Sequence, residues 1–512
     1  MDYSEPAPEA ESVAPSLPVI DRRRVITQGL VWSGMLQVFL VAANFVSMIV
    51  LVRLLPPAEY GRLAAVTGVL AIINCFSCGN FIAQAIQLHE GEEPDWGAHW
   101  NAGFYIQIGL FVACNAAASI CWFISPYRPM APLLHVASLG FPFDLANQMG
   151  LMRLRRDLNY PTLRLVQAIG TIITVVVSIC LALLGAGAFS LVIGYNILNG
   201  MPQGFYLLLI KKWQPPRGWW RWPKWRDYVT PLKFGAQLSG STGLAAARGM
   251  LEATVLPATI GYAAVGLLNR AQVLFATTGG RVAALVVDIV YPLLPRSAGN
   301  PEQFSRYATL FVKTILFISI PAAVFVAIDG PLLSRLLYGQ KWIAADPLIC
   351  PSTILAWAVA TLLVFVAVLQ ARNRLRLAFS SNLIAAISAM PAMLVAIKGG
   401  GALWYAWTLA IGQLVVVCIV AKVASSLLER HWFARGVLPS IVAALAGILS
   451  VVLFKMVLPN LATVSRLCLE AFVFTVVVAL VQRCFFSGLL REIILRLPGR
   501  DLLLGLTFLR TN

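Results

Sequence analysis

Five ionisable side chains lie inside two stretches of sequence that are otherwise apolar enough to cross a membrane. They are Arg248 and Glu252 in residues 234–256, and Arg270, Arg281 and Asp288 in residues 262–291. A charge at the centre of a bilayer costs about 3 kcal/mol on insertion scales unless it faces a partner or a water-filled cavity. We therefore expect these side chains to face the interior of a helix bundle.

The spacing of these residues places them on common helix faces. Arg281 and Asp288 follow Arg270 by eleven and eighteen residues, which returns each to nearly the same face at about 100° per residue. Arg248 and Glu252 are four residues apart and can form an ion pair within one helix. Because the arginines outnumber the carboxylates, positive charge is left over after pairing, and an anion is its natural complement. Alternatively, the five residues serve only as structural ion pairs between helices.

The composition indicates an all-α polytopic membrane protein. Hydrophobic residues make up 59% of the chain and charged residues only 12%, with a mean hydropathy of +0.79. Apolar stretches of roughly 18–25 residues mark candidate spans. They predict about fourteen transmembrane helices, near residues 29–52, 63–88, 101–124, 131–152, 162–184, 188–210, 234–256, 262–290, 308–328, 347–369, 378–397, 402–423, 437–458 and 467–486.

The distribution of lysine and arginine predicts the orientation of the chain. If the amino terminus is cytoplasmic, most of the 39 lysines and arginines fall in the tails and connectors on the cytoplasmic side. The net charge of +17 is explained by this bias and does not call for a nucleic-acid partner. We expect a multi-pass protein of the inner (plasma) membrane.

The most basic connector, residues 211–233, carries five tryptophans interleaved among seven cations. This mixture is typical of a segment lying on the anionic cytoplasmic leaflet. The connector divides the chain into parts that we predict as follows: a disordered cytoplasmic tail (1–28), an amino-terminal six-helix lobe (29–210), the linker (211–233), a carboxy-terminal six-helix lobe (234–425), and two additional helices with a cytoplasmic tail (426–512).

An internal repeat supports two lobes of the same orientation. LPPAEYGRLAAV at residues 55–66 is echoed by LPATIGYAAV at 256–265, and GAGAF at 185–189 is echoed by GGGAL at 399–403. The basic connectors at 153–164 and 372–376 also correspond. A duplicated six-helix unit would leave such matches, with the two copies related by an axis along the membrane normal.

Catalytic motifs are absent from the sequence. There is no GxxxxGK[ST] phosphate loop, no HExxH and no cluster of histidines and cysteines. The single CxxC, Cys75 to Cys78, lies in an apolar span and is more typical of small-residue packing than of a metal or redox site. We therefore expect no enzyme activity, no metal and no cofactor.

Five short motifs follow one another along the chain. They are RLLPPAEYG at residues 53–61, RDLNY at 156–160, GAFSLV at 187–192, YPLLPR at 291–296 and LYGQKW at 337–342. With these motifs, residues 25–425 resemble the polysaccharide transporters, or O-antigen and exopolysaccharide flippases, of the multidrug/oligosaccharidyl-lipid/polysaccharide exporter superfamily. The resemblance implies alternating access by two lobes around a central cavity, which moves an undecaprenyl-diphosphate-linked oligosaccharide from the cytoplasmic to the outer leaflet. It also implies membrane lipids, a polysaccharide polymerase and export machinery as partners.

A lipid-linked sugar needs cations for its diphosphate and hydrogen-bonding side chains for its glycan. We expect Arg248, Arg270 and Arg281 to bind the diphosphate, because arginine offers bidentate donors, with Glu252 and Asp288 beside them. Hydrogen-bonding candidates for the glycan are Gln37, Asn44, Asn74, Asp144, Asn196 and Asn199. Alternatively, such side chains only bond neighbouring helices, which is worth about 0.6 kcal/mol each.

Two other classes of protein stay open. A multidrug or toxin antiporter of the same superfamily would need carboxylates in excess in its cavity, whereas arginines are in excess in this sequence. A membrane-embedded glycosyltransferase or polymerase would usually carry a large extramembrane loop with carboxylates, and the sequence has no long connector of this kind.

Overall fold

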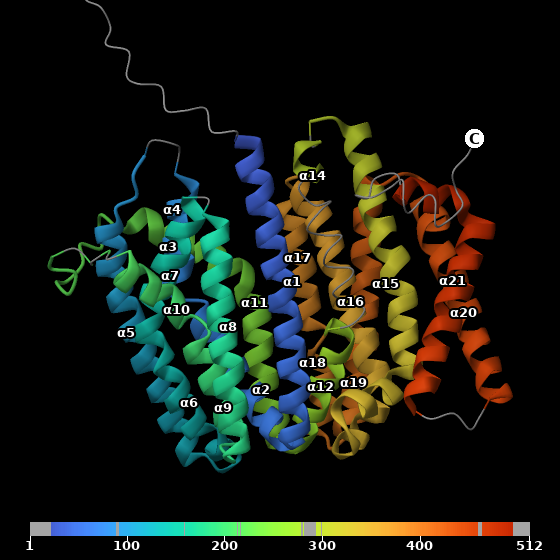
Figure 1. Ribbon diagram of the computed structural model, residues 1–512, viewed down its shortest axis with the longest axis horizontal. Helices are drawn as coiled ribbons and strands as arrows, with labels where there is room; N and C mark the ends of the chain where they lie inside the picture. The colour runs from blue at the N-terminus through green and yellow to red at the C-terminus, as the bar shows by residue number, and fades with distance from the viewer. Residues whose placement is uncertain are drawn as a thin grey trace, which may run out of the picture.

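The computed structural model describes residues 22–88, 92–157, 159–211, 217–277, 293–297, 299–458 and 463–494, together with residues 213, 215 and 280. Nearly all of these residues are helical, and no strand occurs among them (Figure 1). Within this part of the chain, nine helices are long and apolar enough to cross a membrane, or ten if one bent pair is counted as a span. The predicted all-α membrane fold is confirmed. The count of fourteen spans stays a prediction.

The amino-terminal half of the chain contains many short or broken helices. It consists of α1 (Arg22–Leu54), α2 (Pro57–Asn74), α3 (Cys78–Ile82), α4 (Gln84–Gln87), α5 (Trp96–Phe123), η1 (Ser125–Met130), α6 (Ala131–Ser138), α7 (Gly140–Arg156), α8 (Tyr160–Leu183), α9 (Ala188–Val192), the π-helical η2 (Ile193–Leu198), α10 (Met201–Phe205) and the π-helical η3 (Tyr206–Ile210). The second predicted span bends by 41° after α2. Ser77 begins the new helix there by accepting a hydrogen bond from the Gly79 amide.

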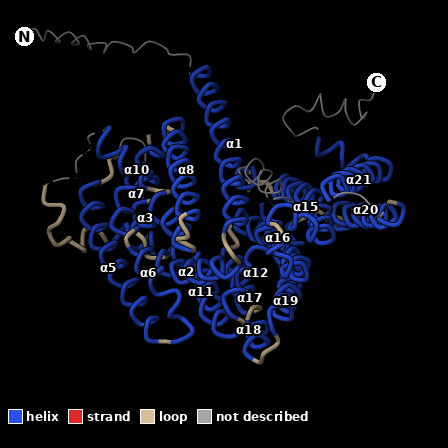
Figure 2. The backbone as a smooth tube through the Cα atoms, turned by 60° about the horizontal axis from the view of Figure 1, so that its bottom comes forward, coloured by secondary structure: helices blue, strands red, loops and turns tan. Residues whose placement is uncertain are grey.

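The carboxy-terminal half has longer helices. It consists of α11 (Val229–Thr259), α12 (Gly261–Thr277), α14 (Leu293–Arg296), α15 (Pro301–Tyr338), η4 (Gln340–Ala345), α16 (Asp346–Ala371), α17 (Leu375–Ile387), α18 (Met390–Ile397), α19 (Gly401–Ala424), η5 (Ser425–Leu427), the π-helical η6 (Phe433–Val437), α20 (Leu438–Val457) and α21 (Thr463–Ile494). Helices α20 and α21 lie side by side at the edge of the bundle remote from α5 (Figure 2).

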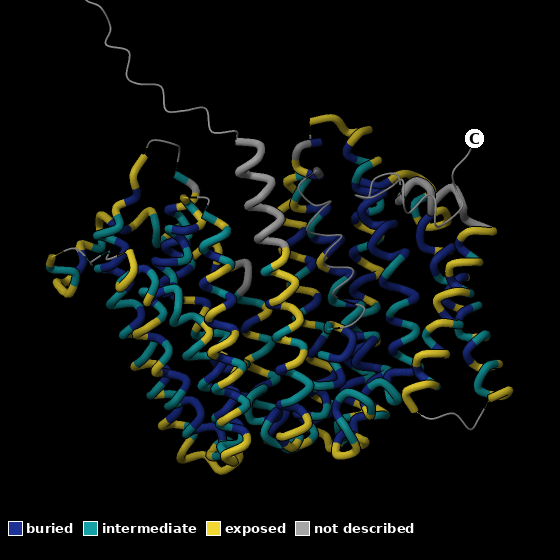
Figure 3. The backbone as a smooth tube through the Cα atoms, in the orientation of Figure 1, coloured by how far each residue is buried: buried dark blue, intermediate teal, exposed yellow. Residues whose placement is uncertain are grey.

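The outer surface of the bundle is apolar, as a membrane protein requires. Large hydrophobic side chains such as Phe123, Leu184 and Met456 are 86%, 82% and 73% exposed. Exposed residues recur along the described parts of α1 and α21, as in helices that turn one face outward (Figure 3). In water such a surface would be strongly unfavourable, and in a bilayer it faces lipid.

The tryptophan-rich linker packs against α5 and is not a free segment. Asn101 donates to the Trp219 carbonyl at 2.8 Å, and Tyr105 donates to the Trp220 carbonyl at 2.8 Å. The Trp219 ring meets Phe104 edge-on at 4.8 Å. The Trp222 ring meets Tyr105 edge-on at 5.0 Å, and the outer faces of Trp220 and Trp222 leave these side chains 59% and 72% exposed. We call this end of the bundle the linker end, and the opposite end, where α1 turns into α2, the Pro57 end.

The two copies of the internal repeat pack against each other at the Pro57 end. Gly61 of α2 lies so close to α12 that a Cβ atom on it would be 1.7 Å from the Tyr262 carbonyl oxygen. Reciprocally, a Cβ atom on Gly266 of α12 would be 1.9 Å from the Pro57 carbonyl oxygen. The absence of side chains at both positions lets the two helix backbones touch.

At the same end, α1 exchanges hydrogen bonds with the last turn of α15 and with η4, which directly follows it. The side chain of Arg53 donates to the carbonyls of Leu336 and Leu337, the last turn of α15. In return, the Trp342 indole donates to the Val52 carbonyl at 2.9 Å, and Lys341 donates to the Leu54 carbonyl at 3.1 Å. Arg53 therefore satisfies carbonyl groups at the end of α15, and η4 satisfies carbonyl groups at the end of α1.

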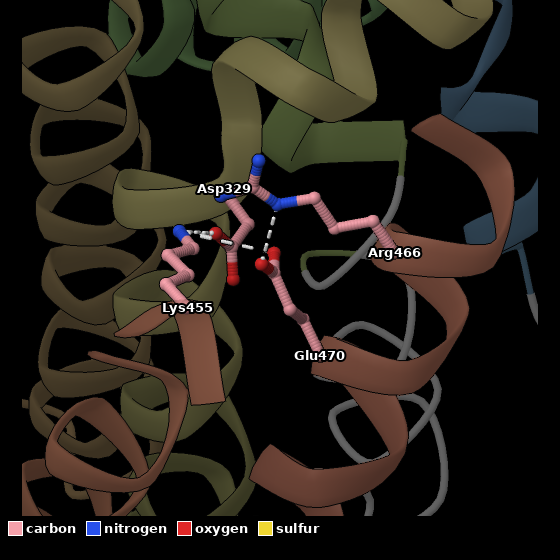
Figure 4. A network of polar contacts seen from close by, with 4 residues as sticks. All are labelled: Asp329, Lys455, Arg466 and Glu470. Atoms are coloured by element: carbon pink, nitrogen blue, oxygen red, sulfur yellow. Dashed lines mark hydrogen bonds and ion pairs between the residues drawn. The ribbon is translucent and has the colours of Figure 1, made fainter. Parts of the chain in front are cut away.

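A buried ion network fastens α20 and α21 to α15 (Figure 4). The side chains of Asp329 on α15 and Glu470 on α21 are 1% and 0% exposed. Lys455 of α20 contacts Asp329 and lies 3.8 Å from Glu470, and Arg466 bonds Glu470 at 2.9 Å. The two carboxylates and two cations balance one another, which is the condition for holding charge inside a membrane protein.

Candidate functional site

A cavity of about 830 Å³ lies within the amino-terminal half of the protein. Its walls come from α2, α3, α7, η2 and α10, with one residue from each of α6 and α11. More than half of the lining residues are polar: Thr67, Asn74, Ser77, Asn80, Asp144, Asn147, Gln148, Arg155, Tyr195, Asn196, Asn199 and Gln203. Only one carboxylate and one guanidinium are among them, so the cavity wall is dominated by neutral amides.

Helix α7 supplies the longest wall of the cavity because its polar residues repeat with helical spacing. Asn147, Gln148 and Arg155 follow Asp144 by three, four and eleven residues, so all four point from one face. The opposite wall, η2 and α10, approaches α7 closely at Gly140. A Cβ atom there would lie 2.6 Å from the Asn196 carbonyl oxygen.

The Asp144 carboxylate is held by neutral donors. Ser77 Oγ, Gln107 Nε2 and Gln148 Nε2 donate to it at 2.9, 2.7 and 3.0 Å. None of the ion pairs in the described part of the chain involves Asp144. The carboxylate is therefore fixed in orientation and remains a hydrogen-bond acceptor at the cavity wall.

The structure brings together four of the residues that the sequence predicted for the site. Asn74, Asp144, Asn196 and Asn199 all line this one cavity. The two predicted residues of α1 lie elsewhere: Gln37 and Asn44 are exposed, and neither side chain lines the large cavity. Asn44 donates to the Leu40 carbonyl of its own helix at 2.8 Å.

The predicted charged residues of α11 and α12 are not at the large cavity. Glu252 lines a separate cavity of about 250 Å³ between α2, α11, α12 and α19, and its carboxylate pairs with Arg248 at 2.9 Å, as the spacing predicts. Arg270 lies over the Tyr60 ring at 4.5 Å and bonds the Asn269 side chain at 2.6 Å. Arg270 lines neither cavity. Arg281 and Asp288 lie outside the described residues.

The pairing of Arg248 with Glu252 leads to a testable expectation. Arg248→Gln should lower the free energy of unfolding in detergent by about 1–3 kcal/mol, because the partly buried Glu252 carboxylate loses its cation. Thermal unfolding measures this change. The double change Arg248→Gln with Glu252→Gln should restore most of that stability and keep transport. Loss of transport in a stably folded double variant would instead show that these charges act on the substrate.

Sequence reasoning missed Arg155 and Asn147 as cavity residues. The sequence pattern assigns Arg155 to a basic connector, whereas α7 continues to Arg156 and carries it onto the cavity face. A sequence signal for Arg155 does exist: it follows Asp144 by eleven residues, a spacing that places both side chains on the same face of a helix. No group of three or more His, Cys, Asp or Glu side chains that could hold a metal occurs in the described residues.

Comparison with known proteins identifies a family and several similar proteins. Residues 50–347 match the family described as "Polysaccharide biosynthesis protein". The chain is 18% identical over 319 residues to an "Uncharacterized membrane protein in cps region" of Klebsiella pneumoniae, covering 62% of this chain and 65% of that protein. It is 23% identical over 333 residues to the "Succinoglycan biosynthesis transport protein ExoT" of Rhizobium meliloti, covering 64% of this chain and 65% of that protein. Both matches thus span slightly less than two thirds of the relative.

A solved structure shares the fold across most of the chain. The lipid II flippase MurJ, in an inward closed conformation, superposes with a TM-score of 0.72 at 13% identity. The match covers 90% of this chain and 100% of that chain.

Proposed function

Because this chain belongs to the family of polysaccharide biosynthesis proteins, we propose that it moves a polyprenyl-diphosphate-linked oligosaccharide across a membrane by alternating access. A related protein is named as a succinoglycan transport protein, and the fold is that of a lipid II flippase. We place the chain in the bacterial inner membrane with its amino terminus in the cytoplasm, which would make the linker end cytoplasmic. The protein would be a transporter rather than an enzyme.

The amide-rich cavity is the observation that carries this proposal. Each Asn or Gln side chain offers both donors and an acceptor, so a wall of amides can bond the hydroxyl groups of a sugar in either sense. Its volume of about 830 Å³ falls within the ~300–1,000 Å³ typical of small-molecule sites. A multidrug exporter of organic cations would favour carboxylates in excess, and this cavity has a single one, Asp144.

The diphosphate needs a cation, and several remain candidates. Arg270 carries no carboxylate partner among the described residues and sits near the Pro57 end, beyond the cavity. We keep Arg270 and Arg281 as candidate contacts for the diphosphate later in the transport cycle. Arg248 and Glu252, together with Asp288, are then supporting charges near that path.

Replacing cavity amides tests the proposal. The double change Asn74→Leu with Asn196→Leu removes two hydrogen-bonding groups from the cavity wall. At about 0.5–1.5 kcal/mol per hydrogen bond, we expect surface polysaccharide to fall roughly tenfold. Lipid-linked oligosaccharide should accumulate in the inner leaflet, as measured in cells that carry only the variant.

A matched change outside the cavity controls for loss of a polar group in a span. Thr408 is partly exposed on α19, where it donates to the Trp404 carbonyl of its own helix, so Thr408→Leu should leave export unchanged. Normal export by the double asparagine variant would contradict the glycan-binding role of the cavity. If deletion of the protein left the polysaccharide unaffected but sensitised cells to organic cations, the chain would be a multidrug antiporter.

A further inference from the structure

The last turn of α7 carries three arginines, and two of them have structural partners. The Arg153 guanidinium lies over the Trp213 ring at 4.4 Å, which fastens the linker to α7. Arg156 donates to the carbonyl of Ala85 in α4 and to the carbonyl of Glu92 beyond it, which fastens both to the end of α7. Both side chains therefore hold neighbouring backbone in place.

Arg155 differs from its two neighbours. Its side chain lines the large cavity and is exposed. Among the residues that the structure describes, it takes part in none of the ion pairs, side-chain hydrogen bonds or cation–π contacts that engage Arg153 and Arg156. A guanidinium that faces a cavity without a protein partner is available to a ligand.

The cavity is polarised along α7. Asp144 lies eleven residues before Arg155, about 16 Å along the helix axis at 1.5 Å per residue. Asn147 and Gln148 come between them on the same wall. The cavity thus presents a cation at the linker end, neutral amides in the middle and a carboxylate deeper inside. A ligand with an anionic group at one end and neutral hydroxyl groups at the other is complementary to this order.

The position of Arg155 also suits a substrate that stays attached to a lipid. Arg153 in the same turn touches the tryptophan-rich linker, whose mixture of tryptophan and basic residues favours the headgroup region of a membrane. An anion held beside this turn lies at the depth of phospholipid headgroups, where the diphosphate of a lipid-linked sugar resides before transport. The glycan beyond it can then enter the cavity.

We propose that Arg155 binds the diphosphate of the lipid-linked substrate at the mouth of the cavity. This inference rests on the proposed function and adds the residue that positions the substrate before it is moved. Its planar guanidinium bonds phosphate oxygens in pairs. Arg155 thereby fixes the position of the substrate along the cavity, so that the first sugars lie against Asn147 and Gln148.

Binding to the full-length protein in lipid nanodiscs tests this assignment. The probes are undecaprenyl diphosphate and the neutral alcohol undecaprenol. We expect Arg155→Gln to weaken binding of the diphosphate by about tenfold or more, as loss of a charge-assisted hydrogen bond does, and to leave binding of the alcohol unchanged. Arg155→Lys should recover part of the affinity, because it restores the charge without the paired donors.

Arg374 provides the matched control. It is exposed, precedes α17 in the corresponding basic connector of the other half, and lines neither cavity, so Arg374→Gln should bind both probes as the wild type does. Equal binding of the diphosphate by wild type and Arg155→Gln would overturn the inference and leave the proposed function intact. A parallel loss of both probes, or of thermal stability, would also overturn it, because it would make Arg155 a structural residue. If the wild-type protein did not bind the diphosphate, and cells lacking the protein made a normal amount of surface polysaccharide, the proposed function would fail as well.

Discussion

Alanine in place of Gly61 is expected to destabilise the protein by about 3 kcal/mol or more. The added Cβ atom would lie 1.7 Å from the Tyr262 carbonyl oxygen, and that atom belongs to the backbone of α12 and cannot turn aside. Helices α2 and α12 would have to separate along their whole contact, including the reciprocal approach of Gly266 to Pro57. Thermal unfolding of the purified protein in detergent measures the effect.

A second glycine provides the control, because it shows the effect of a glycine-to-alanine change in a helix where no close contact is lost. Gly109 lies within α5, and a Cβ atom there would have no neighbour within 4 Å. Gly109→Ala should therefore stabilise the helix by up to about 1 kcal/mol. If Gly61→Ala unfolded at the wild-type temperature, the backbones of α2 and α12 would not be in contact in the dominant state.

Replacement of Lys455 by methionine is expected to cost about 3–5 kcal/mol, the range for breaking a buried ion pair from one side. The Asp329 carboxylate is 1% exposed and would lose the lysine that contacts it, while Arg466 stays bound to Glu470 (Figure 4). Thermal unfolding in detergent measures this cost, and we expect α20 and α21 to be the first part of the chain to become accessible to protease.

Two further variants separate charge from packing at Lys455. Lys422 is exposed at the end of α19, so Lys422→Met removes the same charge and should change stability by less than about 0.5 kcal/mol. Adding Asp329→Asn to Lys455→Met should recover much of the loss, because no unpaired carboxylate then remains. A Lys455→Met variant as stable as Lys422→Met would show that the network does not hold α20 and α21 in place.

Hydropathy determined the membrane fold because every span must be apolar over most of its length, whatever its neighbours are. Helical spacing was also sufficient for the ion pair of Arg248 with Glu252, since both residues belong to one helix. The boundaries between the two predicted lobes and the linker are a prediction still. They are defined by which helices move together, and this is a property of the whole assembly of helices and not of any local sequence pattern.

Four of the predicted site residues lie together in the structure, and the separate positions of the others have a common cause. Asn74, Asp144, Asn196 and Asn199 converge on one cavity although they come from three different spans. Gln37 and Asn44 are equally polar, but the rotation of α1 about its axis is set by its packing on α8, which no local pattern reveals. Arg270 finds its ring partner, Tyr60, more than two hundred residues away in the sequence.

The exchange of hydrogen bonds between α1 and the α15–η4 segment has a kinetic consequence. Arg53 of α1 donates to carbonyls of α15, and Lys341 and Trp342 of η4 donate to carbonyls of α1. The Trp342 indole is fully buried, so water cannot replace its bond until the two segments part. The enthalpy of this buried bond must therefore be supplied before water or new contacts can replace it, which adds to the activation barrier for opening the Pro57 end. Opening should then be the slow step of the cycle, and its rate should rise steeply with temperature.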